Sequence, residues 1–172
     1  FRKGWIDAYR PTIAGIADRL LDEIEVRGEH DIVSGFARAL PLEVICEMLG
    51  LQGDRREFME WMTGFSGRMN AWTLIRIIPT IGRLTAYLRK EIDRARVDQQ
   101  PCLLTEIVNA EADGERMTDD EMMAMLILLF VAGHETTTHL LSTGIHALLT
   151  HRDQLDLFKA DGSRAPQAVE EI

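Results

Sequence analysis

The longest uninterrupted apolar stretch of the chain, Met122 to Gly133, constrains the fold more than any other feature. It follows Thr118–Glu121, where a threonine and a glutamate three residues apart match the capping box that starts a helix. A helix is therefore predicted from about Thr118 to Leu149, and at about 1.5 Å per residue it is a rod of roughly 50 Å. The apolar run is about twelve residues, whereas a membrane span needs about twenty, so we expect a buried core helix. A rod of this length suits a protein larger than 172 residues.

The rest of the chain also reads as helical. Pro11 suits the first turn of a helix, and Gly50 suits a helix end. Further helices are predicted over residues 11–27, 36–49, 54–68, 81–98, 103–110, 151–160 and from Pro166. Two segments do not fit: residues 31–33 look like a short extended stretch, and residues 70–78 look irregular, with Pro79 at their end. The predicted fold class is mostly α, in a single partial domain over residues 1–172.

Composition excludes several classes of partner. Of the 172 residues 46% are hydrophobic, and the net charge is −9. No basic stripe is available to neutralise phosphates, so neither nucleic acid nor an anionic membrane surface is expected as a partner. Cys46 and Cys102 stand far apart, which fits a reducing cytoplasm better than a disulfide framework. No signal or transit sequence is visible.

A second feature interrupts the long helix at its middle, where residues 132–137 read Ala-Gly-His-Glu-Thr-Thr. Glycine and threonine are poor helix formers, and a carboxylate is costly to bury beside apolar residues. At about 100° per residue, Gly133 lies at the centre of one helix face and Thr136 follows one turn later. We expect a small ligand to approach the backbone at Gly133, beside a Thr136 hydroxyl that can also bond back to the Ala132 carbonyl.

The same residues allow a purely structural interpretation. Gly133 also permits a close helix crossing, and the threonines can pack between helices with their hydroxyls satisfied. Glu135 favours the functional interpretation. It points away from Gly133 and needs a cationic or water partner on another element.

His134 and Glu135 also match the start of the zinc-protease pattern H-E-x-x-H. The second histidine, His139, comes one residue too late for that pattern. Residues five apart differ by about 140° around a helix, so the two rings cannot share one metal ion. We therefore expect no zinc site here.

Taken together, these motifs resemble the cytochrome P450 family of haem-thiolate monooxygenases, in its soluble bacterial type. Residues 128–137 are similar to that family's distal motif, in which an apolar lead-in precedes a small residue, a glycine, an acid and two hydroxyl residues. Further similar segments are residues 10–13, 41–45, 118–121, 147–151 and 168–171. The resemblance covers nearly the whole chain. It implies a partial P450 fold that runs through the central helices to the long distal haem helix.

The resemblance also implies a function. A complete enzyme of this kind inserts one oxygen atom of O2 into a small hydrophobic substrate at a haem iron (iron protoporphyrin IX). Thr136 and Glu135 would then act in oxygen activation and proton delivery. The implied cofactor-binding residues are Ala132, Gly133, Thr136 and Thr137, the substrate-facing residues are Leu128 and Val131, and the structural glutamate is Glu171. Electrons would come from NAD(P)H through a ferredoxin-type donor and its reductase, in the cytoplasm.

The sequence departs from the family pattern in three places. Arg152 stands where the family usually has proline, and the arginine that pairs with Glu171 would lie two residues beyond Ile172. The glycine-rich loop that carries the haem-ligating cysteine is absent, since neither Cys46 nor Cys102 has that context. We therefore expect an internal fragment that has no axial metal ligand and is inactive alone.

Two other functions remain open. A non-catalytic helical module could hold haem or another hydrophobic ligand in the same pocket, without thiolate ligation and hence without oxygen cleavage. A plain helical interaction module would bind no cofactor at all.

Overall fold

The computed structural model describes residues 3–27, 31–53, 61, 71–112 and 115–171. The elements in chain order are α1 (Lys3–Arg27), the π-helix η1 (Val33–Ala37), α2 (Ala39–Leu49), α4 (Ala71–Asp98), α5 (Leu103–Asn109), β1 (Glu111–Ala112), β2 (Glu115–Arg116), α6 (Asp119–Thr150), α7 (Arg152–Ala160), the 3-10 helix η2 (Gly162–Arg164) and α8 (Ala165–Glu171). The prediction of a mostly α chain is confirmed. β1 and β2 form one small antiparallel hairpin. The predicted helix over residues 54–68 falls largely outside the described residues.

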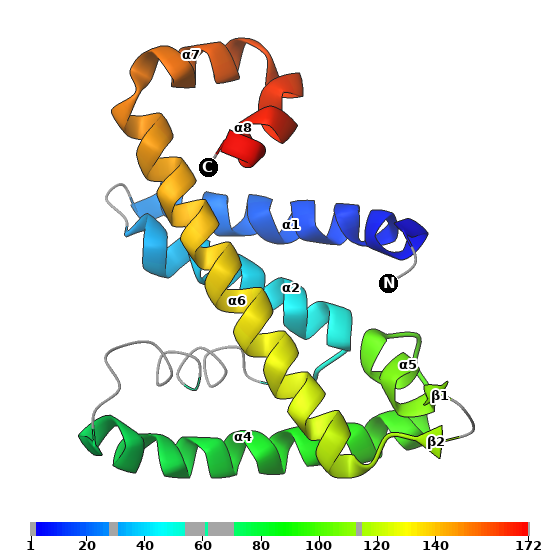
Figure 1. The fold of residues 1–172 in the computed structure, drawn as a ribbon. Helices are drawn as coiled ribbons and strands as arrows, with labels where there is room; N and C mark the ends of the chain where they lie inside the picture. The colour runs from blue at the N-terminus through cyan, green and yellow to red at the C-terminus, as the bar shows by residue number, and fades with distance from the viewer. Residues whose placement is uncertain (1–2, 28–30, 54–60, 62–70, 113–114, 172) are drawn as a thin grey trace.

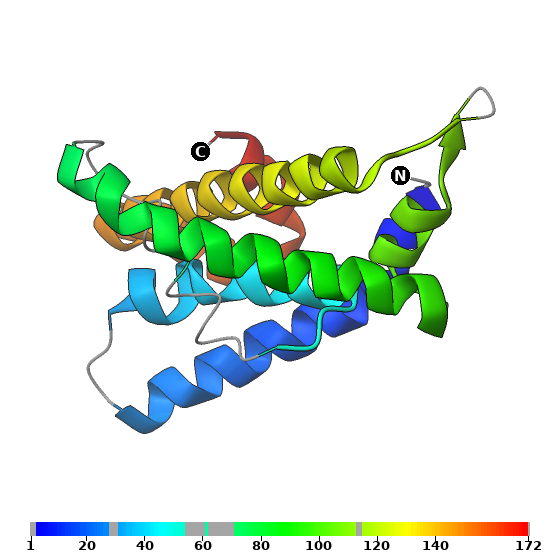
Figure 2. The same cartoon turned by 90° about the horizontal axis from the view of Figure 1, so that it is seen from below.

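Helix α6 organises the molecule. It runs diagonally across the whole structure and contacts α2, α4, η1 and α7 (Figure 1). Seen from below, α2 lies between α1 and α6 (Figure 2). By length and composition alone α6 could cross a membrane. Some of its apolar residues, such as Leu126 and Phe130, are buried against these helices, whereas others, such as Leu128, stay exposed.

The start of α6 is held as the sequence predicts. The Thr118 hydroxyl accepts a hydrogen bond from the Glu121 amide at 3.3 Å, and the Glu121 carboxylate accepts one from the Thr118 amide at 2.8 Å. These bonds satisfy backbone donors that a helix start leaves free. Arg96 of α4 also donates to Asp119, which lowers the pKa of that carboxyl below its usual value. This pair ties the end of α4 to the start of α6.

The main core lies where α2, α4, α5 and α6 meet. Its largest fully buried side chains are Leu42, Leu49, Leu88, Ile92, Leu104, Met122, Leu126 and Phe130. Each contributes about 1.5–3 kcal/mol through removal of apolar surface from water. A smaller cluster of Ile16, Leu20 and Phe36 fixes α1 against η1. The first part of α6 is thus packed in the main core, and Ile145 near its end packs against the smaller cluster.

An arginine connects the end of α2 to α4. Gly50 ends α2 in the left-handed conformation with φ of 66°, as expected for a glycine stop. Its carbonyl accepts a hydrogen bond of 2.6 Å from Arg94, and Arg94 also pairs with the buried Glu91. The ion pair offsets the cost of burying the Glu91 charge.

Two predicted helix boundaries and one predicted element type are wrong. Pro11 lies inside α1 and Pro79 lies inside α4, so neither begins or ends a helix. Both rings are exposed, and bending away from the core is tolerated on the solvent side of a helix. The stretch predicted as extended leads instead into η1, because the Asp31 carboxylate accepts hydrogen bonds from the Val33 and Ser34 amides.

Candidate active site

Gly133 lies where α6 crosses α2. A Cβ atom placed on Gly133 would lie only 2.9 Å from Cδ1 of Ile45. The absence of a side chain therefore lets the two helices approach closely. This is the structural interpretation that the sequence left open. It accounts for the glycine without a ligand.

Two threonine hydroxyls bond back onto the helix at the same place. Thr136 donates to the Ala132 carbonyl at 2.6 Å, and Thr137 donates to the Gly133 carbonyl at 2.9 Å. The predicted back-bond of Thr136 is confirmed. Hydroxyls bonded in this way satisfy themselves locally, so both threonines are tolerated within a long helix.

The face of α6 that is turned away from the buried core is apolar and exposed. Leu128 is 65% exposed and Val131 is 39% exposed, and Ala132 and Thr136 are exposed with them. Met125 and Leu140 extend the same strip. As the sequence predicts, Gly133 and Thr136 are neighbours about 60° apart around the helix, but they differ in exposure. Thr136 borders the open strip, whereas Gly133 turns toward Ile45. A flat apolar group laid along this strip would meet small or apolar side chains and one hydroxyl.

Glu135 lies beside a small cavity of about 170 Å³ between α6 and η1. The residues that line it from α6 are His134, Glu135, Thr138, His139 and Ser142, and η1 and its C-terminal cap add Val33 and Arg38. Glu135 is half-buried, and about 100° of helix rotation separates it from Thr136. The acid therefore reaches the cavity while the threonine reaches the open strip. Arg38 is a cationic group from another element that lines the same cavity, but no ion pair joins it to Glu135 among the described residues, so the expected cationic or water partner of Glu135 stays a prediction.

His134 is a site residue whose burial the sequence analysis missed. It is only 4% exposed, and neither ring nitrogen has a hydrogen-bond partner of normal geometry among the described residues. Burial lowers its pKa below the ordinary value, and the backbone of Arg38 and the charge of Glu135 oppose that shift only in part. A signal was present in the sequence: His134 follows the core residue Phe130 by four positions, which places both on one helix face.

Metal ligation finds no support among the residues that the structure describes. No group of three His, Cys, Asp or Glu side chains lies close enough to hold an ion. His134 is buried whereas His139 is exposed. Cys46 is buried and Cys102 half-buried, and Cys102 lies beside Thr105 with 3.3 Å between the sulfur and the hydroxyl oxygen.

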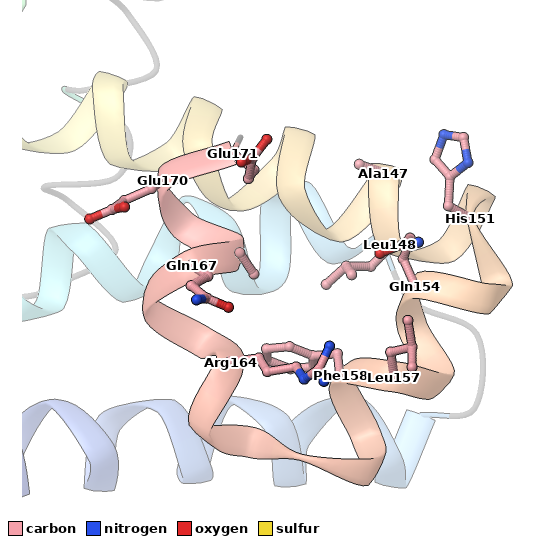
Figure 3. A pocket seen from close by; sticks show the side chains of 11 residues that line it. Ala147, Leu148, His151, Gln154, Leu157, Phe158, Arg164, Gln167, Glu170 and Glu171 are labelled. Carbon is pink, nitrogen blue, oxygen red and sulfur yellow. The ribbon is translucent and has the colours of Figure 1, made fainter.

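Glu171 lies far along the chain from this site. It lines a groove of about 600 Å³ between α8 and the end of α6 with α7 (Figure 3). Leu148, Leu157 and Phe158 give this groove an apolar wall, and Arg164 and Glu170 add charge. None of the other residues predicted for the site lines it. The groove is therefore separate from the candidate active site.

The sequence and the structure were compared with known proteins. The family model described as cytochrome P450 matches residues 56–157. The chain is 35% identical to a steroid C26-monooxygenase from Mycolicibacterium smegmatis, and the match covers 94% of this chain and 41% of that protein. It is 36% identical to a vitamin D(3) 25-hydroxylase from Pseudonocardia autotrophica, over 94% of this chain and 40% of that protein.

The fold is also similar to that of solved cytochrome P450 structures. The ligand-free structure of cytochrome P450 TbtJ1 matches with a TM-score of 0.90 and 35% identity, over 96% of this chain and 45% of that one. The chain belongs to the cytochrome P450 family. It spans about two fifths of the length of the curated relatives that it matches.

Proposed function

We propose that the chain forms the distal part of a haem-dependent monooxygenase that inserts one oxygen atom of O2 into a small hydrophobic organic substrate. The observation that carries this proposal is the open apolar strip of α6, with the Thr136 hydroxyl on its border. A protein seldom leaves such a strip uncovered unless a ligand or another segment covers it. Because the chain belongs to the P450 family, we infer that the ligand of this face is the haem that carries out the oxygen chemistry. Residues 1–172 are then one part of a single larger domain.

The residues of the strip fit a flat apolar cofactor. Haem, when bound, supplies the redox and oxygen chemistry. We assign Ala132 and Thr136 to its edge on the open face, and Gly133 and Thr137 to the adjoining, more buried border. The exposed side chains of Leu128 and Val131 are the substrate-facing groups.

Glu135 and Thr136 have different roles in supplying protons. The Thr136 hydroxyl is held at a fixed place by its bond to the Ala132 carbonyl, so its oxygen can accept a further hydrogen bond from the open side. The Glu135 side chain lines the cavity, about 100° around the helix from Thr136, and its carboxylate can exchange protons with water there. Protons pass from solvent to the Glu135 carboxylate. The Thr136 hydroxyl then directs their delivery through hydrogen bonds on the open strip of α6.

Partners and location follow from the same proposal. Resemblance to soluble bacterial members supports a cytoplasmic enzyme that receives electrons from NAD(P)H through a ferredoxin-type donor and its reductase. Glu171, at the end of α8, is assigned a structural role in holding the segment that follows it.

The test uses the complete protein. Its reduced form with carbon monoxide is expected to show the spectrum of thiolate-ligated haem. A protein that binds haem without that spectrum, or binds none, would instead be one of the non-catalytic alternatives. The 172-residue chain alone is expected to be inert.

Thr136→Ala is expected to leave haem binding intact and to divert reducing equivalents from product to peroxide. The matched control is Thr150→Ala, because Thr150 makes the same type of back-bond, 2.8 Å to the His146 carbonyl, at the far end of α6. Unchanged coupling of NAD(P)H use to product in Thr136→Ala would remove Thr136 from the proposed role.

A further inference from the structure

Ile45 of α2 fills the space beside Gly133 at the crossing of α2 and α6. A Cβ on Gly133 would lie 2.9 Å from Cδ1 of Ile45 and 3.7 Å from its Cγ1. Carbon atoms pack best at about 3.5–4.0 Å, so only the terminal methyl group of Ile45 stands in the way of a side chain there. That methyl group therefore takes the place of a Gly133 side chain and sets the spacing of the two helices.

Helix α2 gives this contact a firm support, because it lies between α1 and α6 (Figure 2). The buried Glu43 of α2 pairs with Arg19 of α1. At the other end of α2, the Gly50 carbonyl accepts a hydrogen bond of 2.6 Å from Arg94 of α4. These bonds hold α2 on both sides of Ile45 along the chain. A change in the size of Ile45 is therefore expected to move α6 more than α2.

The Thr136 hydroxyl depends on the main chain at the same point. It donates to the Ala132 carbonyl at 2.6 Å, and that carbonyl belongs to the planar peptide group that joins Ala132 to Gly133. Thr137 donates to the Gly133 carbonyl at 2.9 Å, which belongs to the next peptide group. The hydroxyl on the border of the open strip therefore moves with the main chain at Gly133.

We propose that Ile45 is a positioning residue, which through its contact at Gly133 sets the place of the Thr136 hydroxyl on the border of the open strip. Ile45 acts from the α2 side of α6, whereas the strip lies on the side turned away from the core. It therefore acts on a group bound to the strip only through the main chain of α6. The consequence for the reaction rests on the proposed function, but the effect of Ile45 on the placement of residues 132–137 does not.

The first experiment compares crystal structures of the complete protein, its Gly133→Ala variant and the double variant with Ile45→Val. Gly133→Ala is expected to push residues 132–137 away from α2 by about 0.6 Å, which is the difference between 2.9 Å and a normal contact of about 3.5 Å. Ile45→Val removes Cδ1 and is expected to return these residues, with the Thr136 hydroxyl, to their original place. If Ile45 rotated aside in Gly133→Ala and residues 132–137 did not move, the inference would be overturned.

The second experiment measures how the haem-loaded protein divides reducing equivalents between product and peroxide. Gly133→Ala is expected to lower the share that reaches product by about threefold or more, since a displacement of about 1 Å can cost as much as about 100-fold in rate. Adding Ile45→Val is expected to restore most of that share. The matched control is Ile107→Val, which removes one carbon from the same core on α5 and is expected to restore nothing. Equal effects of the two valine substitutions would contradict a specific role for Ile45.

Thr136→Ala separates this inference from the proposed function. If Thr136→Ala lowers the product share but Gly133→Ala does not, the positioning role of Ile45 fails and the role of Thr136 stands. If Thr136→Ala changes nothing, the proposed role of Thr136 fails, and the crystal structures still decide whether Ile45 places residues 132–137.

Discussion

Replacing Gly133 with alanine tests whether this glycine is retained for the crossing of α6 and α2. The substitution gains about 1 kcal/mol of helix propensity. It also brings a Cβ to 2.9 Å from Ile45 Cδ1, whereas two carbon atoms pack best at about 3.5–4.0 Å. Overpacking of this kind costs about 1–3 kcal/mol. Together, the gain in helix propensity and the cost of overpacking predict that Gly133→Ala lowers the free energy of unfolding by between zero and about 2 kcal/mol.

A second substitution separates the two effects. Ile45→Val removes Cδ1, and the next atom, Cγ1, would lie at an ordinary 3.7 Å from the new Cβ. Alone, Ile45→Val costs about 0.5–1.5 kcal/mol. Combined with Gly133→Ala it relieves the crowding, so the double-mutant cycle is expected to show a favourable coupling of about 1–3 kcal/mol.

The assay is urea unfolding of the complete protein and its variants, compared by their midpoints. Gly82→Ala in α4 is the matched control, because a Cβ there meets nothing within 4 Å and reports helix propensity alone. If Gly133→Ala stabilised the protein as much as Gly82→Ala, the close crossing would not be the reason for the glycine. A coupling near zero with Ile45→Val would refute the assignment of the contact.

Two further predictions concern α6 and use the same assay. Thr118→Ala removes the capping box, and the unfolding midpoint is expected to fall by the equivalent of about 1 kcal/mol; an unchanged midpoint would show that Asp119 and Arg96 suffice to hold the helix start. Burial lowers the folded-state pKa of His134 below its ordinary value of 6.5, so stability is complete above about pH 6.5 and declines as the pH falls through the folded pKa. His134→Phe is expected to lose less stability between pH 7.5 and 5 than the parent, and an equal loss would contradict the burial.

Helix starts and stops with side-chain or glycine signals were predictable from the sequence. Thr118 with Glu121 and Gly50 behave as expected, because their effects are local and need no neighbours. The helix boundaries predicted at Pro11 and Pro79 were wrong for the opposite reason. A proline removes one backbone hydrogen bond, but tertiary packing decides whether the helix continues through it. Leu84, Leu88 and Ile92 hold α4 in the core beyond Pro79.

The positions of the candidate residues along the long helix were predictable from the sequence, but their tertiary neighbours were not. The sequence places Glu135 and Thr136 next to each other at the middle of a long helix, and the structure has them there. It could not show that Ile45 would occupy the space at Gly133, because that contact depends on a residue 88 positions away in the chain. It likewise could not show Arg38 opposite Glu135, since η1 was predicted as a different element.

The threonine back-bonds have a mechanical consequence. The carbonyls of Ala132 and Gly133 each hold a hydroxyl partner from one turn ahead. If the main-chain bonds to these two carbonyls lengthen, neither oxygen is left unsatisfied, so the helix can flex here at less cost than elsewhere along its 32 residues. On one side of this point, up to Phe130, α6 packs in the large core cluster, and on the other side Ile145 packs against the smaller cluster of Ile16, Leu20 and Phe36. The acid and the threonine therefore lie in a stretch of α6 that can bend between two packed segments of the helix.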